Sequence, residues 1–352
     1  MTKIIFVSLL YLISTPLFGC ETIAARTSSA SRVNVQIMTD EADAVLQILA
    51  KKERGQEVTE ADWQKVFQSE GYRRLQKRER SMQRSFEDAD FKTFVLSENL
   101  VKRRQALAET LVRWKESDVN NIAARPLAYL PRNAQIRAKI YPVIKPKENS
   151  FVFEIREDPA IFLYLDPTKS RGIFENEFAH ELHHIGYSTA CPTEASKERI
   201  EKFPPATQRV FGRVGAFGEG FAMLAAAGGA GVHPHAASLP EDRERWDKDL
   251  ANFNNDLKTL EKFFLDVAGG RLTEEIEKQT AFSFFGVQGP WYTVGWRMAV
   301  VIEKTFGREK LIECMCDGRL LLPTFNKAVR KYNRQNKTQL SLWSKELINR
   351  IR

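Results

Sequence analysis

The sequence predicts an α+β protein that is mostly helical, with a small sheet packed beside one central helix at 174–187. Residues 37–117 are heavily charged and carry apolar side chains at helical spacing, which indicates three or four helices. Apolar and charged side chains alternate in 136–140 and 151–155, as they do in strands with one covered face. Residues 160–166 are apolar throughout, which is typical of a strand covered on both faces.

These patterns divide the chain into two regions, which we expect to pack as one compact unit. Residues 37–130 are expected to form an N-terminal helical lobe without chemistry of its own. Residues 131–352 are expected to form the catalytic region. Hydrophobic residues make up 43% of the chain and charged residues 28%, which is ordinary for a folded soluble protein.

The first 20 residues have the pattern of an export signal. Lys3 is followed by a short apolar run at 4–13, and the segment ends in Leu-Phe-Gly-Cys at Cys20. That ending resembles the lipobox of bacterial lipoproteins, in which the cysteine is lipidated and becomes the first residue. Phe18 is unusual at its place in a lipobox, so cleavage by an ordinary signal peptidase is the alternative. We expect a periplasm-facing envelope lipoprotein held in the membrane by a lipid on Cys20, with 21–36 as a flexible tether.

Beyond this segment, the sequence suggests neither a protein with several membrane spans nor a nucleic-acid binder. No second apolar run reaches 18 residues, which excludes several membrane spans. The net charge of +8 is concentrated at 71–84, with six basic residues and one acid. That segment has no recognised nucleic-acid motif and no interleaved aromatic residues, so we interpret it as a solvated helix face.

The predicted strands lead directly into the central helix. Between them and the helix lies the turn-rich segment Asp-Pro-Thr-Lys-Ser-Arg-Gly at 166–172. A sheet beside the helix could offer an edge strand along which an extended peptide could pair.

The central helix, Phe-Glu-Asn-Glu-Phe-Ala-His-Glu-Leu-His-His-Ile-Gly-Tyr at 174–187, contains the pattern H-E-x-x-H. Its apolar residues recur every three or four positions, while His180, Glu181 and His184 fall on another face. Two imidazoles one turn apart can bind the same metal ion, and the neighbouring carboxylate can reach a water bound to that ion. We expect the helix to end at Gly186.

A third ligand is predicted from a solitary acid. Residues 210–231 form mainly a helix of small and apolar residues in which Glu219 is the only carboxylate. A buried charge is costly unless it is paired or binds metal, so Glu219 is the candidate. The alternatives are a Glu219 that points outward or pairs with Arg213. His233 and His235 are rival ligands, although we expect them to flank the cleft instead.

Tyr292 is a candidate for substrate stabilisation. It lies near the start of a helix predicted within 289–307, and Gly295 would allow this helix to pack closely against its neighbour. A phenol there could donate a hydrogen bond in the transition state. The alternative is that Tyr292 is part of the hydrophobic core.

The cysteines do not form a recognisable framework. Apart from Cys20, the chain has Cys191, Cys314 and Cys316. Cys314 and Cys316 are too close in sequence for an easy bridge, and without a second pair they make a poor zinc site. Buried thiols are expected, with a bridge from Cys191 to one of the other two as the alternative in an oxidising compartment.

An H-E-x-x-H helix followed by a glutamate on a later helix resembles the gluzincins, zinc peptidases of the thermolysin-like type. The metzincins need Gly and His where this chain has Tyr187 and Ala190, so that class does not fit. Most of 37–335 resembles a bacterial family known as "putative zinc-dependent peptidases", through segments such as NEFAHELHHIGY, GEGFAM and YTVGWRMAVVIE. The resemblance implies His180, His184 and Glu219 as zinc ligands and Glu181 as general base.

The sequence therefore predicts a zinc-dependent metallopeptidase that acts on a peptide or protein substrate. Glu181 would take a proton from a metal-bound water and return it to the leaving amine. Two alternatives are a non-catalytic metal-binding scaffold lipoprotein and a zinc hydrolase of non-peptide amides.

Overall fold

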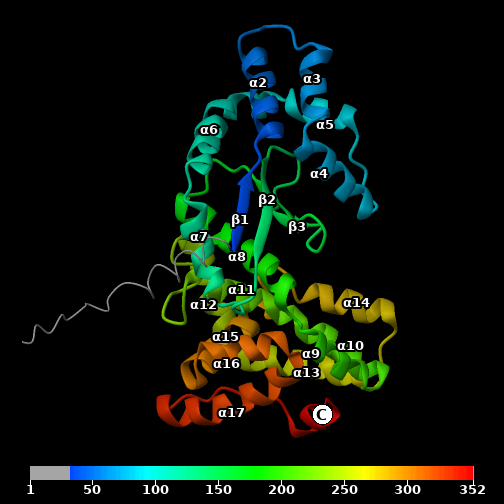
Figure 1. Cartoon of the computed structure of the whole chain (residues 1–352), viewed down its shortest axis with the longest axis vertical. Helices are drawn as coiled ribbons and strands as arrows, with labels where there is room; N and C mark the ends of the chain where they lie inside the picture. The colour runs from blue at the N-terminus through cyan, green and yellow to red at the C-terminus, as the bar shows by residue number, and fades with distance from the viewer. Residues whose placement is uncertain (1–31, 352) are drawn as a thin grey trace, which may run out of the picture.

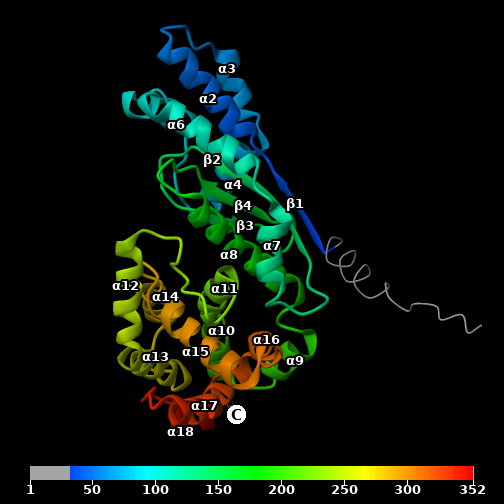
Figure 2. The ribbon, with the colours of Figure 1, turned by 90° about the vertical axis from the view of Figure 1, so that its left-hand side faces the viewer.

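The computed structural model describes residues 32–351, and its elements are arranged around the helix α8 (Arg171–Ala190). The sheet and the N-terminal helices lie on one side of α8, and the C-terminal helices lie on the other (Figures 1 and 2). The fold is α+β and mostly helical, as predicted. The signal peptide with Cys20 lies outside the described residues.

The sheet has four strands in the order β1-β2-β4-β3. β1 (Val33–Ile37) is parallel to β2 (Ile136–Val143), which is parallel to β4 (Ala160–Tyr164). β3 (Phe151–Phe153) is antiparallel to β4 and lies at the edge of the sheet. All five residues of β4 are buried, in agreement with a strand covered on both faces.

The strand β1 corrects the last part of the expected tether at 21–36. Val33 pairs with Ile136 and Ile37 pairs with Ile140, so 33–36 belongs to the sheet, while 21–31 lies outside the described residues. Its sequence, Val-Asn-Val-Gln-Ile, alternates apolar and polar side chains, and its burial alternates in the same way. This alternating pattern is only five residues long, and the strand that β1 pairs with lies 103 positions further along the chain.

The stretch 37–117 contains five helices, not three or four, and a sixth follows within the N-terminal lobe. They are α2 (Asp40–Glu53), α3 (Glu60–Phe67), α4 (Glu70–Ser81), α5 (Asp88–Val95), α6 (Glu98–Lys115) and α7 (Val119–Leu127). Short polar breaks account for the difference, because Ser69 and Ser97 each accept a hydrogen bond from a backbone N–H of the next helix and so start it anew. Thr59 is the N-cap of α3 and forms a capping box with Asp62.

The basic segment at 71–84 is only partly solvated. Arg74 of α4 is 8% exposed, and its guanidinium binds Glu154 and Asp158, each at 2.7 Å. The guanidinium carbon of Arg78 lies 3.9 Å from the ring centroid of Phe151 in β3. The interpretation of this segment as a solvated face was therefore wrong for Arg74 and Arg78, which hold the β3 edge against α4.

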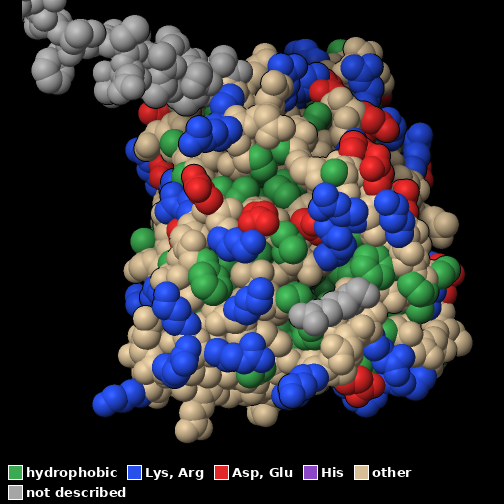
Figure 3. All heavy atoms as spheres, turned by 60° about the horizontal axis from the view of Figure 1, so that its bottom comes forward, with side chains coloured by type: hydrophobic (Ala, Val, Ile, Leu, Met, Phe, Trp, Pro, Cys, Tyr) green, Lys and Arg blue, Asp and Glu red, His purple; other side chains and the backbone are tan. Residues whose placement is uncertain are grey.

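The C-terminal side of the molecule is entirely helical after β4. Its remaining elements are α9 (Glu194–Glu201), α10 (Pro205–Val214), the short 3-10 helix η1 (Gly215–Phe217), α11 (Gly218–Ala227), α12 (Pro240–Ala251), α13 (Phe253–Ala268), α14 (Glu274–Ser283), α15 (Pro290–Phe306), α16 (Arg308–Cys316), α17 (Gly318–Asn336) and α18 (Lys345–Arg350). Residues 205–227 are long and apolar enough to cross a membrane, but two thirds of their 18-residue apolar window is buried inside the protein, as in a core helix. Many Lys and Arg side chains are exposed on the face seen in Figure 3.

The larger of the two hydrophobic clusters found among the described residues extends through both regions of the chain. It includes Ala42 near the start of α2 and Ile351 at the end of the described chain. Trp114 of α6 stacks on Phe174 of α8 with ring centroids 4.3 Å apart, so the N-terminal helices pack directly on the central helix.

The helix α8 does not end at Gly186, as predicted, but continues to Ala190. Gly186 is buried, and a Cβ at this position would lie 2.3 Å from Leu130 Cδ1 and 3.1 Å from Ile136 Cγ1. The glycine therefore allows α8 to lie close to the sheet and is not a helix cap.

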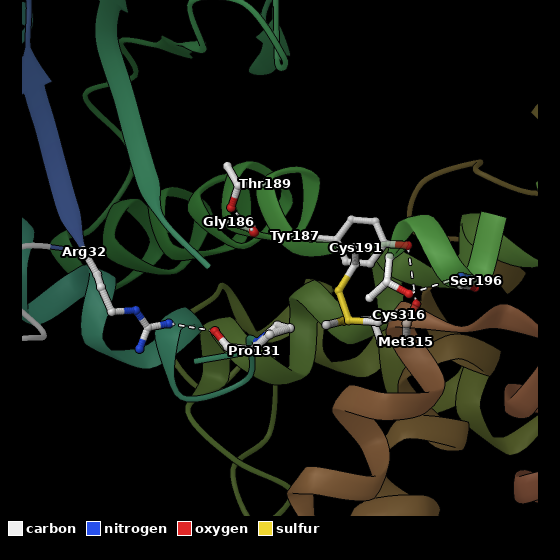
Figure 4. The surroundings of a disulfide bond; sticks show 10 residues. Arg32, Pro131, Gly186, Tyr187, Thr189, Cys191, Ser196, Met315 and Cys316 are labelled. Atoms are coloured by element: carbon white, nitrogen blue, oxygen red, sulfur yellow. Dashed lines mark hydrogen bonds between the residues drawn. A yellow bond between two sulfur atoms is a disulfide. The ribbon is translucent and has the colours of Figure 1, made fainter. Parts of the chain in front are cut away.

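A disulfide joins Cys191, directly after α8, to Cys316 at the end of α16 (Figure 4). The expectation of buried thiols was wrong for these two residues, and the alternative pairing is the one found. Cys314 is a buried free thiol. The bond fixes the C-terminal end of the central helix to the C-terminal helices.

Candidate metal centre

His180 and His184 of α8 and Glu219 of α11 meet at one point. His180 Nε2 lies 3.0 Å from His184 Nε2 and 3.2 Å from Glu219 Oε2, and His184 Nε2 lies 3.4 Å from Glu219 Oε2. The three side chains are 13–22% exposed, so the point that they surround remains open to solvent on one side.

This arrangement fits a zinc ion. Tetrahedral zinc with nitrogen and oxygen ligands at about 2.0–2.1 Å places ligand atoms about 3.3 Å from one another. The three distances in the structure, 3.0, 3.2 and 3.4 Å, are close to this value. Two imidazoles and one carboxylate form a ligand set typical of catalytic zinc, which keeps a fourth position for water or substrate.

Electrostatics favours an ionised carboxylate at this point. Burial alone would raise the pKa of Glu219, but His184 and His180 hold it well below its usual range. Burial would lower the pKa of His184, but the Glu219 carboxylate raises it to about 9. The site thus attracts positive charge, and a metal ion would displace the proton from His184.

A cluster of hydrogen bonds holds the start of α8. Ser170 caps the helix by accepting a hydrogen bond from the N–H of Ile173 at 3.2 Å. Arg125 of α7 donates to Asn176 Oδ1 of α8 and to the Ala226 carbonyl of α11, both at 2.9 Å. Arg125 therefore joins the two helices that carry the candidate metal ligands. Sequence reasoning missed this arginine, because nothing in its local sequence marks it.

The structure does not agree with the alternatives to Glu219 as the third ligand. Arg213 binds Glu277 at 2.8 Å and is not a partner of Glu219. His233 Nε2 lies 3.1 Å from Asp247 Oδ1, and His235 Nδ1 lies 2.9 Å from Ser238 Oγ. Among the described residues, the one group of three that could share a metal ion consists of His180, His184 and Glu219.

Glu181 lies beside the metal centre and outside the ligand group. It is partly buried and lines both cavities that open at the site. Burial raises the pKa of Glu181 above its usual range, and the neighbouring His180 and His184 offset only part of this effect. A carboxylate whose pKa is raised is a stronger base than an ordinary glutamate and is suited to exchange protons with a bound water.

Tyr292 is near the same point. Its ring lies parallel to that of His180, with centroids 6.3 Å apart and an interplanar angle of 18°. Burial and the neighbouring Glu219 carboxylate raise the pKa of Tyr292, so its hydroxyl keeps its proton. The side chain is partly buried and lines both cavities, so it is not simply a core residue.

Two cavities meet at the metal centre. The larger, of about 730 Å³, lies between the β2–β3 connection, α8, α12 and the loop before α15. The smaller, of about 480 Å³, is lined by the β3 edge and by all three residues of the ligand group. Both include His180, Glu181 and Tyr292, so together they form a cleft that passes across the site. His235 lines the larger cavity, as expected for a residue that flanks the cleft.

Comparison with known proteins gives one family. Residues 37–334 match the model of the family described as "Putative zinc dependent peptidase (DUF5700)". The chain matches no curated protein and no solved structure. The matched region begins with the last residue of β1 and includes every side chain of the metal centre. Because the match extends over most of the sequence, the chain belongs to this family of "putative" zinc-dependent peptidases.

Proposed function

We propose that the protein is a zinc metallopeptidase of the gluzincin type, which hydrolyses peptide bonds in the cleft at His180, His184 and Glu219. The observation that carries the proposal is the meeting of these three ligand atoms within 3.0–3.4 Å of one another, beside a carboxylate that is free to act as a base. The family description supports zinc as the metal and a peptide as the substrate.

Zinc held there would supply a water of lowered pKa and would polarise the substrate carbonyl. Glu181 follows His180 in sequence, so its side chain is turned by about 100° around the helix. This offset keeps the carboxylate out of the ligand group but close to it. Glu181 takes a proton from the water as the water attacks the peptide carbonyl, and then gives this proton to the leaving amine.

Tyr292 approaches the reacting carbonyl from the α15 side of the cleft. Because its pKa is raised, the phenol is a hydrogen-bond donor at neutral pH. It donates to the carbonyl oxygen as negative charge develops there, which stabilises the transition state more than the ground state.

The β3 edge offers a place for the substrate backbone. β3 pairs with β4 on one side and is the last strand of the described sheet. Phe151 and Val152 of β3 line the same cavity as the metal-binding residues. An extended peptide can add to this edge through backbone hydrogen bonds, which hold it regardless of sequence.

The substitution Glu181→Gln tests the proposal. It keeps the size of the side chain and removes the basic oxygen. We expect stoichiometric zinc, an unchanged thermal melt and a loss of peptide cleavage by several orders of magnitude. Cleavage close to the wild-type rate would refute the role of Glu181. A wild-type protein that binds zinc and cleaves only non-peptide amides, or nothing, would support the amide hydrolase or the scaffold instead.

We also propose that the protein is exported and held in the membrane by a lipid on Cys20. The Cys191–Cys316 disulfide supports export, because such bonds persist mainly in oxidising compartments. Metabolic labelling with a fatty acid should mark the wild type and not Cys20→Ala. Equal release of both proteins in soluble form, without label, would contradict the anchor.

A further inference from the structure

An apolar cavity of about 470 Å³ lies next to the metal centre and is not used by the mechanism above. It shares Arg156, Tyr187 and Pro192 with the smaller cavity that contains the metal-binding residues. Tyr187 comes one helical turn after His184, and Gly218 directly precedes Glu219. The elements that carry the ligands therefore also form the entrance to this cavity, and its size is within the ~300–1,000 Å³ range typical of ligand pockets.

The walls of the cavity are mainly hydrophobic. Its large apolar side chains are Ile200, Phe211, Val214, Phe221, Met315 and Leu321. The disulfide ties one wall in place, because Cys316 directly follows Met315, whose carbonyl accepts a hydrogen bond from Tyr187 (Figure 4). The cavity is thus a fixed feature of the fold and lies between α8, α10, α11 and α16.

Glycine residues keep one side of the cavity open. Gly212, Gly215 and Gly218 all line it, and a Cβ added to any of them would meet no other atom within 4 Å. Gly215 and Gly218 have ordinary right-handed helical backbone angles, so their conformation does not require glycine. Gly212 and Gly215 are exposed, so they lie at the rim of the cavity, where an alanine would stabilise the helix by roughly 0.5–1 kcal/mol. Without side chains at these positions, the rim of the cavity stays uncovered.

The charges at the cavity select against cationic groups. None of the described residues that line it is acidic, and Arg156 stands at its entrance. Arg156 is exposed and makes no ion pair within residues 32–351. A lysine or arginine side chain would therefore find no partner in the cavity and would be repelled at its entrance. An uncharged apolar side chain would bury its surface against the walls.

We propose that this cavity is the specificity pocket of the enzyme and that it binds a large apolar side chain, such as Leu, Phe or Met, of a residue next to the cleaved bond. The inference rests on the proposed peptidase function. Complete burial of such a side chain favours binding over an alanine peptide by about 10- to 100-fold.

Peptide binding to the Glu181→Gln protein loaded with zinc tests the pocket without cleavage. The probes are labelled peptides of alanine that contain a single Phe, Leu or Lys. We expect the Phe and Leu peptides to bind about 10- to 100-fold more tightly than the all-alanine peptide, and the Lys peptide to show no such gain. Equal binding of all the peptides, or tighter binding of the Lys peptide, would overturn the proposal.

Filling the pocket is the second arm of the test. Gly215→Leu and, separately, Gly212→Leu add a large side chain at the exposed rim of the pocket, where it would obstruct the opening, and a thermal melt checks that each variant folds. We expect the preference for Phe and Leu to disappear while binding of the alanine peptide is kept. Gly231→Leu is the matched control, because Gly231 also has no atom within 4 Å of an added Cβ but does not line the pocket. A preference that persists in both pocket variants would overturn the assignment.

The outcomes separate this proposal from the peptidase function itself. A preference that both pocket variants abolish, in a wild-type protein that cleaves no peptide, would support the pocket and contradict the peptidase. Cleavage by the wild type without any preference at this position would support the peptidase and overturn the pocket.

Discussion

Gly220 of α11 and Gly295 of α15 face each other where the two helices cross. A Cβ at Gly295 would lie 3.3 Å from the Gly220 Cα, and a Cβ at Gly220 would lie 2.1 Å from the backbone nitrogen of Trp296. The close approach brings Glu219, which precedes Gly220, next to Tyr292, one turn before Gly295. The predicted close packing at Gly295 is thus confirmed, and its consequence is the position of a candidate metal ligand beside a candidate hydrogen-bond donor.

We expect Gly220→Ala to destabilise the protein markedly. The new methyl group would collide with backbone atoms of α15, which cannot move without separating the helices, so a loss of about 1–3 kcal/mol or more is expected. Urea unfolding of the variant and the wild type measures this loss of stability. Gly212→Ala is the control, because its methyl group meets no other atom within 4 Å and should leave stability unchanged or slightly higher. Equal stability of the two variants would contradict the crossing.

Zinc content should depend on Glu219. Glu219→Ala removes one of the three ligand atoms, so its affinity should fall by more than the ~10–100-fold typical of losing an outer partner. Competition with a chelator gives the affinity. His233→Ala is the matched control and should keep full zinc, because this imidazole lies against Asp247. If His233→Ala lost zinc and Glu219→Ala kept it, the ligand would have to be sought in the loop after α11.

Tyr292→Phe should separate catalysis from binding. The variant keeps the ring beside His180 and loses the hydroxyl, so zinc content and KM should change little. The loss of one donor to a developing oxyanion lowers kcat by roughly 10²–10³-fold. Steady-state kinetics on a single peptide measures both constants. A rise in KM with unchanged kcat would instead assign Tyr292 to ground-state binding.

The free energy of unfolding should fall with rising pH because of a buried acid that does not line the cleft. Glu41 of α2 is 1% exposed, and burial raises its pKa from 4.5 to about 8. The neutral form is favoured in the fold, so the stability from this group is complete below pH 4.5 and is lost as the pH rises through 8. Lys145 is also buried, and its pKa is lowered from 10.5 to about 8, so it titrates mainly above this window.

Glu41→Gln should remove this pH dependence. The amide oxygen can still accept the hydrogen bond from the N–H of Ile144, now 3.2 Å from the carboxylate. The variant should match the wild type near pH 4.5 and exceed it at pH 8 by on the order of 2–5 kcal/mol. Urea unfolding at several pH values measures the difference. Parallel curves for the two proteins would mean that Glu41 is not the titrating group.

The part of the site that sequence could predict depends on short-range geometry. His180, Glu181 and His184 are fixed relative to one another by one helix, so their spacing alone indicates a metal site. Glu219 was found by a different argument, the cost of a lone charge in an apolar helix. Both arguments need only the residues themselves and the period of the helix.

The features that sequence did not predict depend on partners far along the chain. Arg74 looks like a solvated residue until Glu154 and Asp158 are placed next to it by the sheet. Gly186 looks like a helix cap, and only the contact with Leu130 gives its real role. The pairing of Cys191 with Cys316 likewise requires the ends of two helices to meet, which no local pattern encodes.

The disulfide also decides how the protein would respond to a pulling force. The bond spans 125 residues, so tension between the two ends of the chain bypasses everything from 192 to 315. At about 3.6 Å per residue, the oxidised chain would extend about 450 Å less than the reduced one. His180 and His184 lie on the stretched part and Glu219 within the shielded loop. In the oxidised protein, the metal centre would therefore connect a loaded segment to an unloaded one.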